Sequence, residues 1–420
     1  MSASQGSEEL DPPPPPSDDF IASAPRVSVQ AFCETQATAE AVQSAGLDRR
    51  LAKAHLTIKM GGMEAAIETY HSVPTPNVII LETGGSSDVL AGLDELATVC
   101  DAGTRVVLIG GEDDVAPYRE LVRRGVSDYV VGPVQTLDVV RAICGLFSAS
   151  EAVAVGRIIA VVGAKGGVGA STVAHNVAWA IAHDLALDSV VIDLDMAFGT
   201  ASLDYNKDPL QGIANAVFAN ERPDSAFIER LLAKCNDHLS LLAAPAALDR
   251  VYDFGADAFD AVFDTLRLTT PCIVLDIPHQ WSGWTRRALV GADDILIVAE
   301  PDLANLRNAK NMLGMLKAAR PNDRPPLYCL SQVGMSKRPE ISPREFAKAM
   351  ENQPIATIPF DPRMFGTAAN NGQMIAEISA NHRISKTFVH IANQLTGRTE
   401  PRKPRGSILA PIINKLRSRA

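Results

Sequence analysis

A glycine-rich turn after an apolar run carries the strongest chemical signal in the sequence. The run Ile158–Val162 is followed by Gly163, Ala164, Lys165, Gly166, Gly167, Val168, Gly169, Ala170, Ser171 and Thr172. Glycines let backbone N–H groups close around phosphate oxygens, and a following helix points the positive end of its dipole at the same charge. A strand, this turn and a helix over 173–183 therefore predict a nucleotide-phosphate site formed by 163–172.

The turn departs from the strict P-loop pattern at two positions. Ala164 stands where that pattern has its first glycine, and Ala170 stands where it has its lysine. Ala170 removes the ammonium that bridges the β- and γ-phosphates in such sites. The earlier Lys165 remains available, and the Ser171 hydroxyl is placed to reach Mg²⁺.

Carboxylates follow two other apolar runs. Asp193 and Asp195 come after Val190–Ile192, and Asp276 ends Ile273–Leu275. Either acid alone is better explained as a helix N-cap or a surface residue. Because these acids follow successive strands beside the glycine turn, together they predict a site that binds a metal and takes part in catalysis. Asp276 is expected to hold Mg²⁺ through water.

The elements that must position these residues form a long α/β alternation over 155–396. The expected strands are Ile158–Val162, Val190–Ile192, Leu239–Leu242, Ile273–Leu275, Ile295–Val298, Leu327–Leu330 and Ala356–Ile358. Right-handed crossovers would wind them into one parallel sheet covered on both faces. In such a sheet the ligand binds at the carboxyl ends of the strands, which is where the turn and the acids fall.

A smaller α/β alternation precedes it, over 26–148. Its expected strands are Val27–Phe32, Val78–Leu81, Val106–Ile109 and Tyr129–Val131, and its expected helices are Thr38–Ala45, Tyr118–Arg124 and Leu137–Leu146. Short continuous apolar runs are typical of strands buried on both faces. The predicted fold class is therefore α/β, with two doubly wound parallel-sheet domains, the first of receiver size.

The flanking segments differ in charge. Residues 1–25 are rich in proline and acids, which predicts a disordered arm, and 397–420 form a basic tail. The net charge of −10 argues against a specific nucleic-acid partner. No export pattern or membrane-spanning apolar run is present, and the six cysteines lack paired spacing, so a reducing cytoplasmic location is expected.

The order Lys-Gly-Gly-Val-Gly-x-Ser over 165–171 resembles the MinD/ParA superfamily of deviant-Walker P-loop ATPases. The resemblance implies ATP and Mg²⁺ as cofactors and a homodimer in which Lys165 reaches the partner's nucleotide. It also implies that Asp195 positions the attacking water. Ser331 stands where the family reads adenine, and Pro359 begins a loop that resembles the one closing over the base.

Further motifs resemble the CpaE/TadZ proteins of tight-adherence and Flp-type pilus assembly. They lie at 174–179, 276–279, 332–340 and 369–373. These proteins also join a receiver-like domain to a MinD-like domain in this order. The resemblance implies a cytoplasmic factor at a cell pole or inner-membrane site that recruits pilus and secretion assembly proteins.

The receiver-like domain lacks the residues for phosphorylation. Glu82 stands where a receiver has its phosphoacceptor aspartate, and Gly132 replaces its lysine, so a pseudo-receiver used for dimerisation or docking is predicted. In the tail, Ser407–Arg419 spaces apolar residues along one helical face flanked by bases. That helix either binds a membrane surface, as in MinD-type proteins, or docks on the protein's own core.

Three functions follow from these features. The first is an ATP-binding dimeric localisation and assembly factor for Flp/Tad-type pili, a weak ATPase that converts ATP and water slowly or conditionally to ADP and phosphate. The alternative is a cycling, membrane-associated ATPase like MinD, against which the loss of the P-loop lysine counts. A DNA-partitioning protein is third, because the acidic balance disfavours it.

Overall fold

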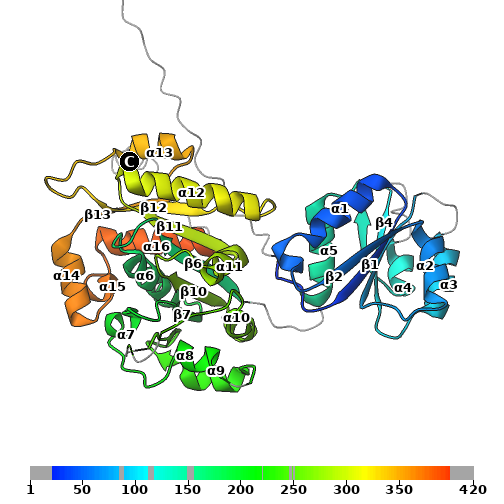
Figure 1. Cartoon of the computed structure of the whole chain (residues 1–420), viewed down its shortest axis with the longest axis horizontal. Helices are drawn as coiled ribbons and strands as arrows, with labels where there is room; N and C mark the ends of the chain where they lie inside the picture. Colours follow the sequence, from blue (N-terminus) through cyan, green and yellow to red (C-terminus); the bar gives the residue numbers. More distant parts are fainter. Residues whose placement is uncertain are drawn as a thin grey trace, which may run out of the picture.

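The computed structural model describes residues 21–84, 89–111, 118–148, 156–219, 221–245, 248 and 251–397. The tail helix predicted for 407–419 lies outside these residues, as does the predicted arm up to residue 20. Figure 1 shows two α/β domains side by side, the first in blue to cyan and the second in green to red. Among the described residues no helix combines the length and apolar character needed to cross a bilayer.

The first domain is built on a five-stranded parallel sheet with the order β2-β1-β3-β4-β5. Its strands are β1 (Ser28–Cys33), β2 (His55–Met60), β3 (Val78–Glu82), β4 (Arg105–Gly110) and β5 (Val126–Val131). Its helices are α1 (Gln36–Gly46), the 3₁₀ turn η1 (Arg49–Leu51), α2 (Gly62–Tyr70), α3 (Val89–Val99), α4 (Tyr118–Arg123) and α5 (Thr136–Ser148). The order is that of flavodoxin-like doubly wound folds.

This domain differs from the sequence prediction in several features, among them α2 and α3, which were not among the expected helices. β2 was missed because it is an edge strand with mostly exposed side chains, so it lacks a continuous apolar run. The end of the arm predicted for 1–25 is also ordered on the domain. Ala24 is buried and its N–H donates to the carbonyl of Arg50 at 2.9 Å.

The second domain is built on an eight-stranded sheet with the order β13-β12-β11-β6-β10-β7-β9-β8. The strands are β6 (Arg157–Gly163), β7 (Ser189–Asp193), β8 (Ala233–Lys234), β9 (Leu239–Leu242), β10 (Cys272–Ile277), β11 (Asp294–Ala299), β12 (Leu327–Val333) and β13 (Ala356–Pro359). All neighbours are parallel except β8, which pairs antiparallel with β9. The seven strands predicted from the sequence pair parallel as expected, and β8 is an additional two-residue edge strand that was not predicted.

Helices cover both faces of the second sheet (Figure 1). They are α6 (Ala170–His183), α7 (Ala201–Asp204), α8 (Ile213–Val217), α9 (Ser225–Leu231), α10 (Asp260–Arg267), α11 (Gly283–Gly291), α12 (Leu303–Ala319), α13 (Pro343–Met350), α14 (Pro362–Asn371), α15 (Ile375–Ile378) and α16 (Arg383–Thr396). Alternate residues of β6 enter two separate apolar cores. One core receives α8 to α13, and the other receives α6, α7 and α14 to α16. This burial on both faces explains the continuous apolar runs of the central strands.

An arginine of η1 joins the two domains. Arg49 donates to Asp323 at 2.6 Å and to Asp293 at 3.2 Å. Its neighbour Arg50 pairs with both Asp48 and Asp323. All of these side chains are largely buried, so the contact is desolvated and stronger than a surface ion pair.

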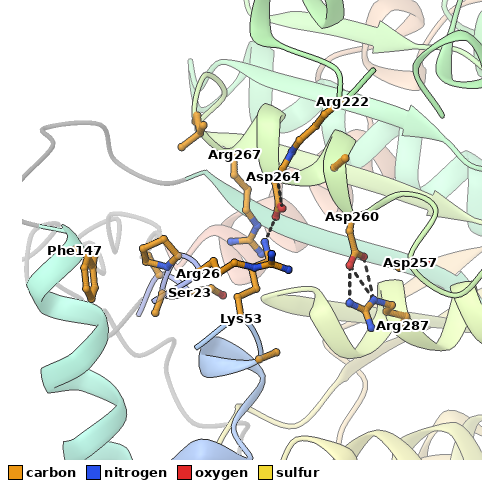
Figure 2. Close-up of a pocket in the computed structure, with 16 residues that line it drawn as sticks. Ser23, Arg26, Lys53, Phe147, Arg222, Asp257, Asp260, Asp264, Arg267 and Arg287 are labelled. Atoms are coloured by element: carbon orange, nitrogen blue, oxygen red, sulfur yellow. Dashed lines mark hydrogen bonds and ion pairs between the residues drawn. The ribbon is translucent and has the colours of Figure 1, made fainter. Parts of the chain in front are cut away.

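Beside this contact lies a cavity of about 970 Å³ with walls from both domains (Figure 2). Lys53 of the first domain reaches Asp264 of the second at 2.5 Å, and Arg222 pairs with the same carboxylate at 3.2 Å. Arg287 pairs with Asp260 at 2.6 Å. The charged side chains named here are paired with one another across or within the cavity wall. The cavity is therefore lined by ion pairs where the two domains meet.

Candidate functional site

The glycine turn connects β6 to α6 at the centre of the second sheet. β6 ends at Gly163 and α6 begins at Ala170. Gly167 and Gly169 have φ angles of 83° and 82°, in the left-handed region that side chains disfavour. A Cβ at Gly167 would meet no atom within 4 Å, so this part of the turn is open on its outer side. The backbone of the turn can therefore be approached closely by a ligand.

Hydrogen bonds from other parts of the domain fix the turn. Ala164 donates to the carbonyl of Val298 at 2.8 Å, and Asn308 of α12 donates to the carbonyl of Ala164 at 2.9 Å. Gln332 donates its side-chain amide to the carbonyl of Gly167 at 2.9 Å. The turn is thus held by β11, α12 and β12, which pre-organises it before a ligand binds.

A cavity of about 270 Å³ lies against the turn and extends toward β13 and α14. It brings together residues that the sequence analysis assigned separately to phosphate and to base: Gly167, Gly169, Thr172, Ser331 and Pro359. Val173, Ile358, Phe360, Pro362 and Phe365 supply apolar walls, and Phe365 was not identified from the sequence because it belongs to no motif. A mostly apolar slot beside a phosphate turn suits a nucleotide base.

Lys165 projects from the turn and is half-exposed. Its ammonium lies 3.5 Å from a carboxylate oxygen of Asp302. Asp302 also caps α12, since its other oxygen accepts the N–H of Asn305 at 2.7 Å. Burial opposes ionisation of Asp302, but this cap and Lys165 together hold its pKa below the ordinary value. The lysine therefore has an anionic partner within its own chain.

The predicted acids meet at the carboxyl edge of the sheet. Asp276 of β10 lies directly opposite Asp193 of β7. Asp193 is buried, and burial followed by the charge of Asp276 raises its pKa to about 7. It accepts the N–H groups of Asp195 and Ala201, both at 3.1 Å. Asp193 thus shapes the loop after β7.

Asp195 is partly exposed at the start of this loop. One of its oxygens accepts the N–H groups of Ala197 and Phe198, at 3.3 and 3.0 Å. This local turn fixes the carboxylate, and in the described part of the chain its second oxygen accepts no hydrogen bond. Asp195, predicted to position water, is therefore held rigidly at the same edge as Asp276.

The sequence analysis missed a buried histidine behind these acids. His175 of α6 is fully buried, with Nδ1 2.7 Å from Asp204 and Nε2 3.2 Å from Asp276. Burial lowers the pKa of this imidazole, but the two carboxylates outweigh it and raise the pKa to about 10. In the sequence, the only indication of this role is a histidine among the apolar residues of α6. Its partners, Asp204 and Asp276, come from elements distant in the sequence.

The oxygen donors at this edge suit Mg²⁺ bound together with phosphates. Ser171 lies in the first turn of α6, and Asp276 is the last but one residue of β10, which pairs with β6. No group of three or more His, Cys, Asp or Glu side chains among the described residues could hold a metal alone. Mg²⁺ uses one or two protein oxygens, with substrate phosphates and water completing its shell. The residues therefore fit a metal that arrives with its nucleotide.

In the first domain, Glu82 stands at the position of a receiver's phosphoacceptor, and its carboxylate is hydrogen-bonded to groups of the same chain. Glu82 accepts the N–H groups of Glu34 and Thr35, at 2.7 and 2.8 Å, and the hydroxyls of Thr35 and Thr38. Burial opposes ionisation of Glu82, but these hydrogen bonds lower its pKa. The carboxylate therefore serves to anchor the start of α1.

Comparisons with known proteins show what the second domain is similar to. A family model described as an AAA domain matches residues 156–327. The septum site-determining protein MinD of Synechocystis sp. is 25% identical over 271 residues, which cover 63% of this chain and 98% of that protein. The MinD protein of Pyrococcus horikoshii OT3, solved in complex with Mg-ADP, is 20% identical, covers 57% of this chain and 96% of its own, and has a TM-score of 0.50.

The chain is also similar to the pilus assembly protein CpaE of Caulobacter crescentus CB15. That structure is 43% identical, covers 30% of this chain and 98% of its own, and has a TM-score of 0.29. Three observations point to the same fold for the second domain. They are its strand order, the glycine turn after β6 and its similarity to MinD proteins. The second domain has a fold similar to that of the MinD/ParA P-loop NTPases.

Proposed function

We propose that the protein is an ATP-binding, dimer-forming localisation and assembly factor for a pilus-type secretion apparatus. The observation that carries the nucleotide part is the single cavity of about 270 Å³ shared by Gly167, Gly169, Thr172, Ser331 and Pro359. It places a base slot directly against a pre-organised phosphate turn. The MinD protein of P. horikoshii, which has the same fold, was solved with Mg-ADP, and this supports the same class of ligand here.

Each residue of the site has a distinct role in this proposal. The backbone of 163–170 and the start of α6 bind the phosphates. Ser171 and, through water, Asp276 hold Mg²⁺, which supplies charge neutralisation on the phosphates. Asp195 orients water for attack, and Lys165 leaves Asp302 to reach the nucleotide of a second copy.

Hydrolysis is slow or conditional in this proposal. Ala170 provides no ammonium at the transferring phosphoryl group, and the only lysine of the turn is Lys165, which is half-exposed and paired with Asp302. A missing cationic group at such a site costs orders of magnitude in rate, about 10³–10⁵-fold for an arginine finger. Nucleotide binding then acts mainly as an assembly signal.

The assembly role rests on sequence motifs and domain order. The motifs at 174–179, 276–279, 332–340 and 369–373 resemble those of CpaE/TadZ proteins. In the first domain, Glu82 is saturated by four hydrogen-bond donors, which supports a docking pseudo-receiver over a phosphorylated one. We further propose peripheral attachment at the cell pole or inner membrane through the basic tail.

Sedimentation velocity with and without Mg-ATP tests the proposal directly. The wild-type protein should form a dimer that strengthens with Mg-ATP, and Lys165→Ala and Asp276→Ala should each weaken that response. Asp276→Ala should also lower the affinity for Mg-ADP, because it removes the metal station. Lys165→Ala should bind Mg-ADP as the wild type does, because its role is in the partner's site.

The same data can contradict the proposal. A wild-type sedimentation coefficient that is unchanged by Mg-ATP, together with no detectable Mg-ADP binding, would show that the turn does not act as a nucleotide site. A response to Mg-ATP that survives both substitutions would assign dimerisation to another surface.

A further inference from the structure

His175 is a buried charged group that the phosphate site does not account for. It lies on α6 in the turn after the phosphate-binding residues, with no exposed side-chain surface. Its Nδ1 lies 2.7 Å from Asp204, and its Nε2 lies 3.2 Å from Asp276. A polar side chain is costly in a buried position unless it is paired, so these two contacts need a reason.

The two contacts are unequal. Nδ1 makes a hydrogen bond to Asp204. Nε2 is within ion-pair distance of Asp276, but it makes no hydrogen bond within the described part of the chain. The His175 side chain is therefore held closely by Asp204 and more loosely by Asp276.

Asp204 belongs to the segment that follows the predicted water-positioning acid. This segment, 195–205, runs from Asp195 through α7 to Tyr205 and is here called the β7–α7 segment. Asp193 holds its first half by accepting the N–H groups of Asp195 and Ala201. His175 holds its second half through Asp204, and the hydroxyl of Tyr205 donates to the carbonyl of His175 at 2.8 Å. The segment is thus anchored on the same side of the sheet as the metal station.

We propose that His175 is a positioning residue that couples Asp276 to the β7–α7 segment. The inference rests on the proposed function, because it assumes that Asp276 serves Mg-nucleotide. If Asp276 were to turn an oxygen toward Mg²⁺-bound water, its contact with Nε2 would loosen and the His175 side chain would be held by Asp204 alone. Occupancy of the nucleotide site then tightens the segment that carries Asp195. Because such coupling is reciprocal, a change at Asp204, which lies outside the phosphate site, should alter the affinity for Mg²⁺.

The test combines Mg²⁺-dependent binding with local hydrogen exchange on the full-length protein. The variants are His175→Gln and Asp204→Asn, and the control is His183→Gln, an exposed histidine later in the same helix. For each protein the affinity for ADP is measured with and without Mg²⁺, and amide exchange is followed over 195–205 with and without Mg-ADP.

In the wild type we expect Mg²⁺ to strengthen ADP binding and Mg-ADP to slow exchange over 195–205. In His175→Gln and Asp204→Asn the Mg²⁺ enhancement should fall about 10-fold, the lower end of the effect of removing a partner that orients a metal ligand. ADP affinity without Mg²⁺ should stay unchanged, and Mg-ADP should no longer protect the segment. His183→Gln should behave as the wild type.

A merely structural role for His175 would lower stability and leave the Mg²⁺ enhancement intact, and this result would overturn the inference. Asp204→Asn decides the matter if His175→Gln does not fold, because Asp204 is partly exposed and far less buried than the histidine. If wild-type protein binds no ADP at all, the proposed function itself fails and the coupling falls with it. If ADP binding is normal and only the coupling is missing, the proposed function stands alone.

Discussion

Lys165 is engaged with Asp302 of its own chain, and this contact bears on how a second copy could use it. The ammonium and carboxylate are 3.5 Å apart, and both side chains are partly exposed. An ion pair with this exposure is worth only about 0–1 kcal/mol, so it can be exchanged for a phosphate. The pair therefore competes with, but does not block, a role of Lys165 at a partner's nucleotide.

Replacing Asp302 by asparagine should release Lys165 without unfolding the cap of α12. Asparagine caps helices about as well as aspartate, so the bond to the N–H of Asn305 can persist and the free energy of unfolding should change by less than about 0.5 kcal/mol. The dimer formed with Mg-ATP should become tighter, because less energy is needed to free the lysine. Sedimentation velocity at several protein concentrations measures this.

Asp224→Asn is the matched control for that substitution. Asp224 caps α9 in the same manner, accepting the N–H of Phe227 at 2.7 Å, but no lysine or arginine ion pair is described for it. It should leave the Mg-ATP response unchanged. A weaker dimer in Asp302→Asn than in Asp224→Asn would mean that Asp302 helps to present Lys165 and does not restrain it.

Sequence motifs were sufficient to identify those site residues whose role depends on their neighbours in the sequence. Gly167 and Gly169 were recognised by their spacing, and the structure places them beside Ser331 and Pro359 in one cavity. His175 and Asp302 could not be assigned in this way. Their roles depend on partners that reach them only through the packing of α6, α12 and β10. The roles predicted for Lys165 and Asp195 stay predictions.

At the scale of helices and strands, a strand could be predicted from the sequence when it is buried on both faces. Every strand of the second domain that is buried on both faces had been predicted, and its ends agree with the structure within a few residues. The exposed edge strand β2 and the two-residue β8 had not. An edge strand needs no continuous apolar run, so its sequence is not distinguished from a loop.

Backbone conformation gives a prediction for two glycines in different elements. Gly314 lies in the exposed part of α12, where a Cβ would meet no atom within 4 Å. Gly314→Ala should therefore raise the free energy of unfolding by about 0.5–1 kcal/mol, because alanine is the better helix former. Urea denaturation followed by circular dichroism measures the change.

Gly167→Ala is the counterpart in the phosphate turn. Space is also free there, but φ is 83°, and an alanine in this region is strained by roughly 1–2 kcal/mol. This variant should lose stability and bind Mg-ADP more weakly. Equal effects of the two substitutions would show that the turn is free to change conformation, against the fixed geometry described for it.

At the scale of the whole molecule, the relation of the two domains could not be predicted from the sequence. Both domains were expected, but no motif indicated that Arg49 of the first would pair with Asp293 and Asp323 of the second. Asp293 also accepts the N–H of Ile158, at the start of the strand that leads to the phosphate turn. The contact therefore lies at the opposite end of β6 from the nucleotide site.

Removing Arg49 should loosen the docking between the domains while leaving each folded, because Arg50 still pairs with Asp323 across the boundary. Arg49→Ala leaves Asp323 with Arg320 and Arg50, and leaves Asp293 with Arg267, so neither acid is stranded in the second domain. The radius of gyration from small-angle scattering should rise. Arg123→Ala is the control, since Arg123 is exposed on α4 and pairs only with Glu120 among the described ion pairs.

The position of this contact makes the measurement informative about function. If docking of the first domain supports the strand that carries the phosphate turn, Arg49→Ala should also weaken Mg-ADP binding, while Arg123→Ala should not. If scattering shows separated domains and Mg-ADP binding is unchanged, the first domain acts only as a docking module attached to an independent nucleotide switch. Unchanged scattering would instead mean that the remaining contacts, Arg50–Asp323, Lys53–Asp264 and the cavity wall, are sufficient to hold the domains together.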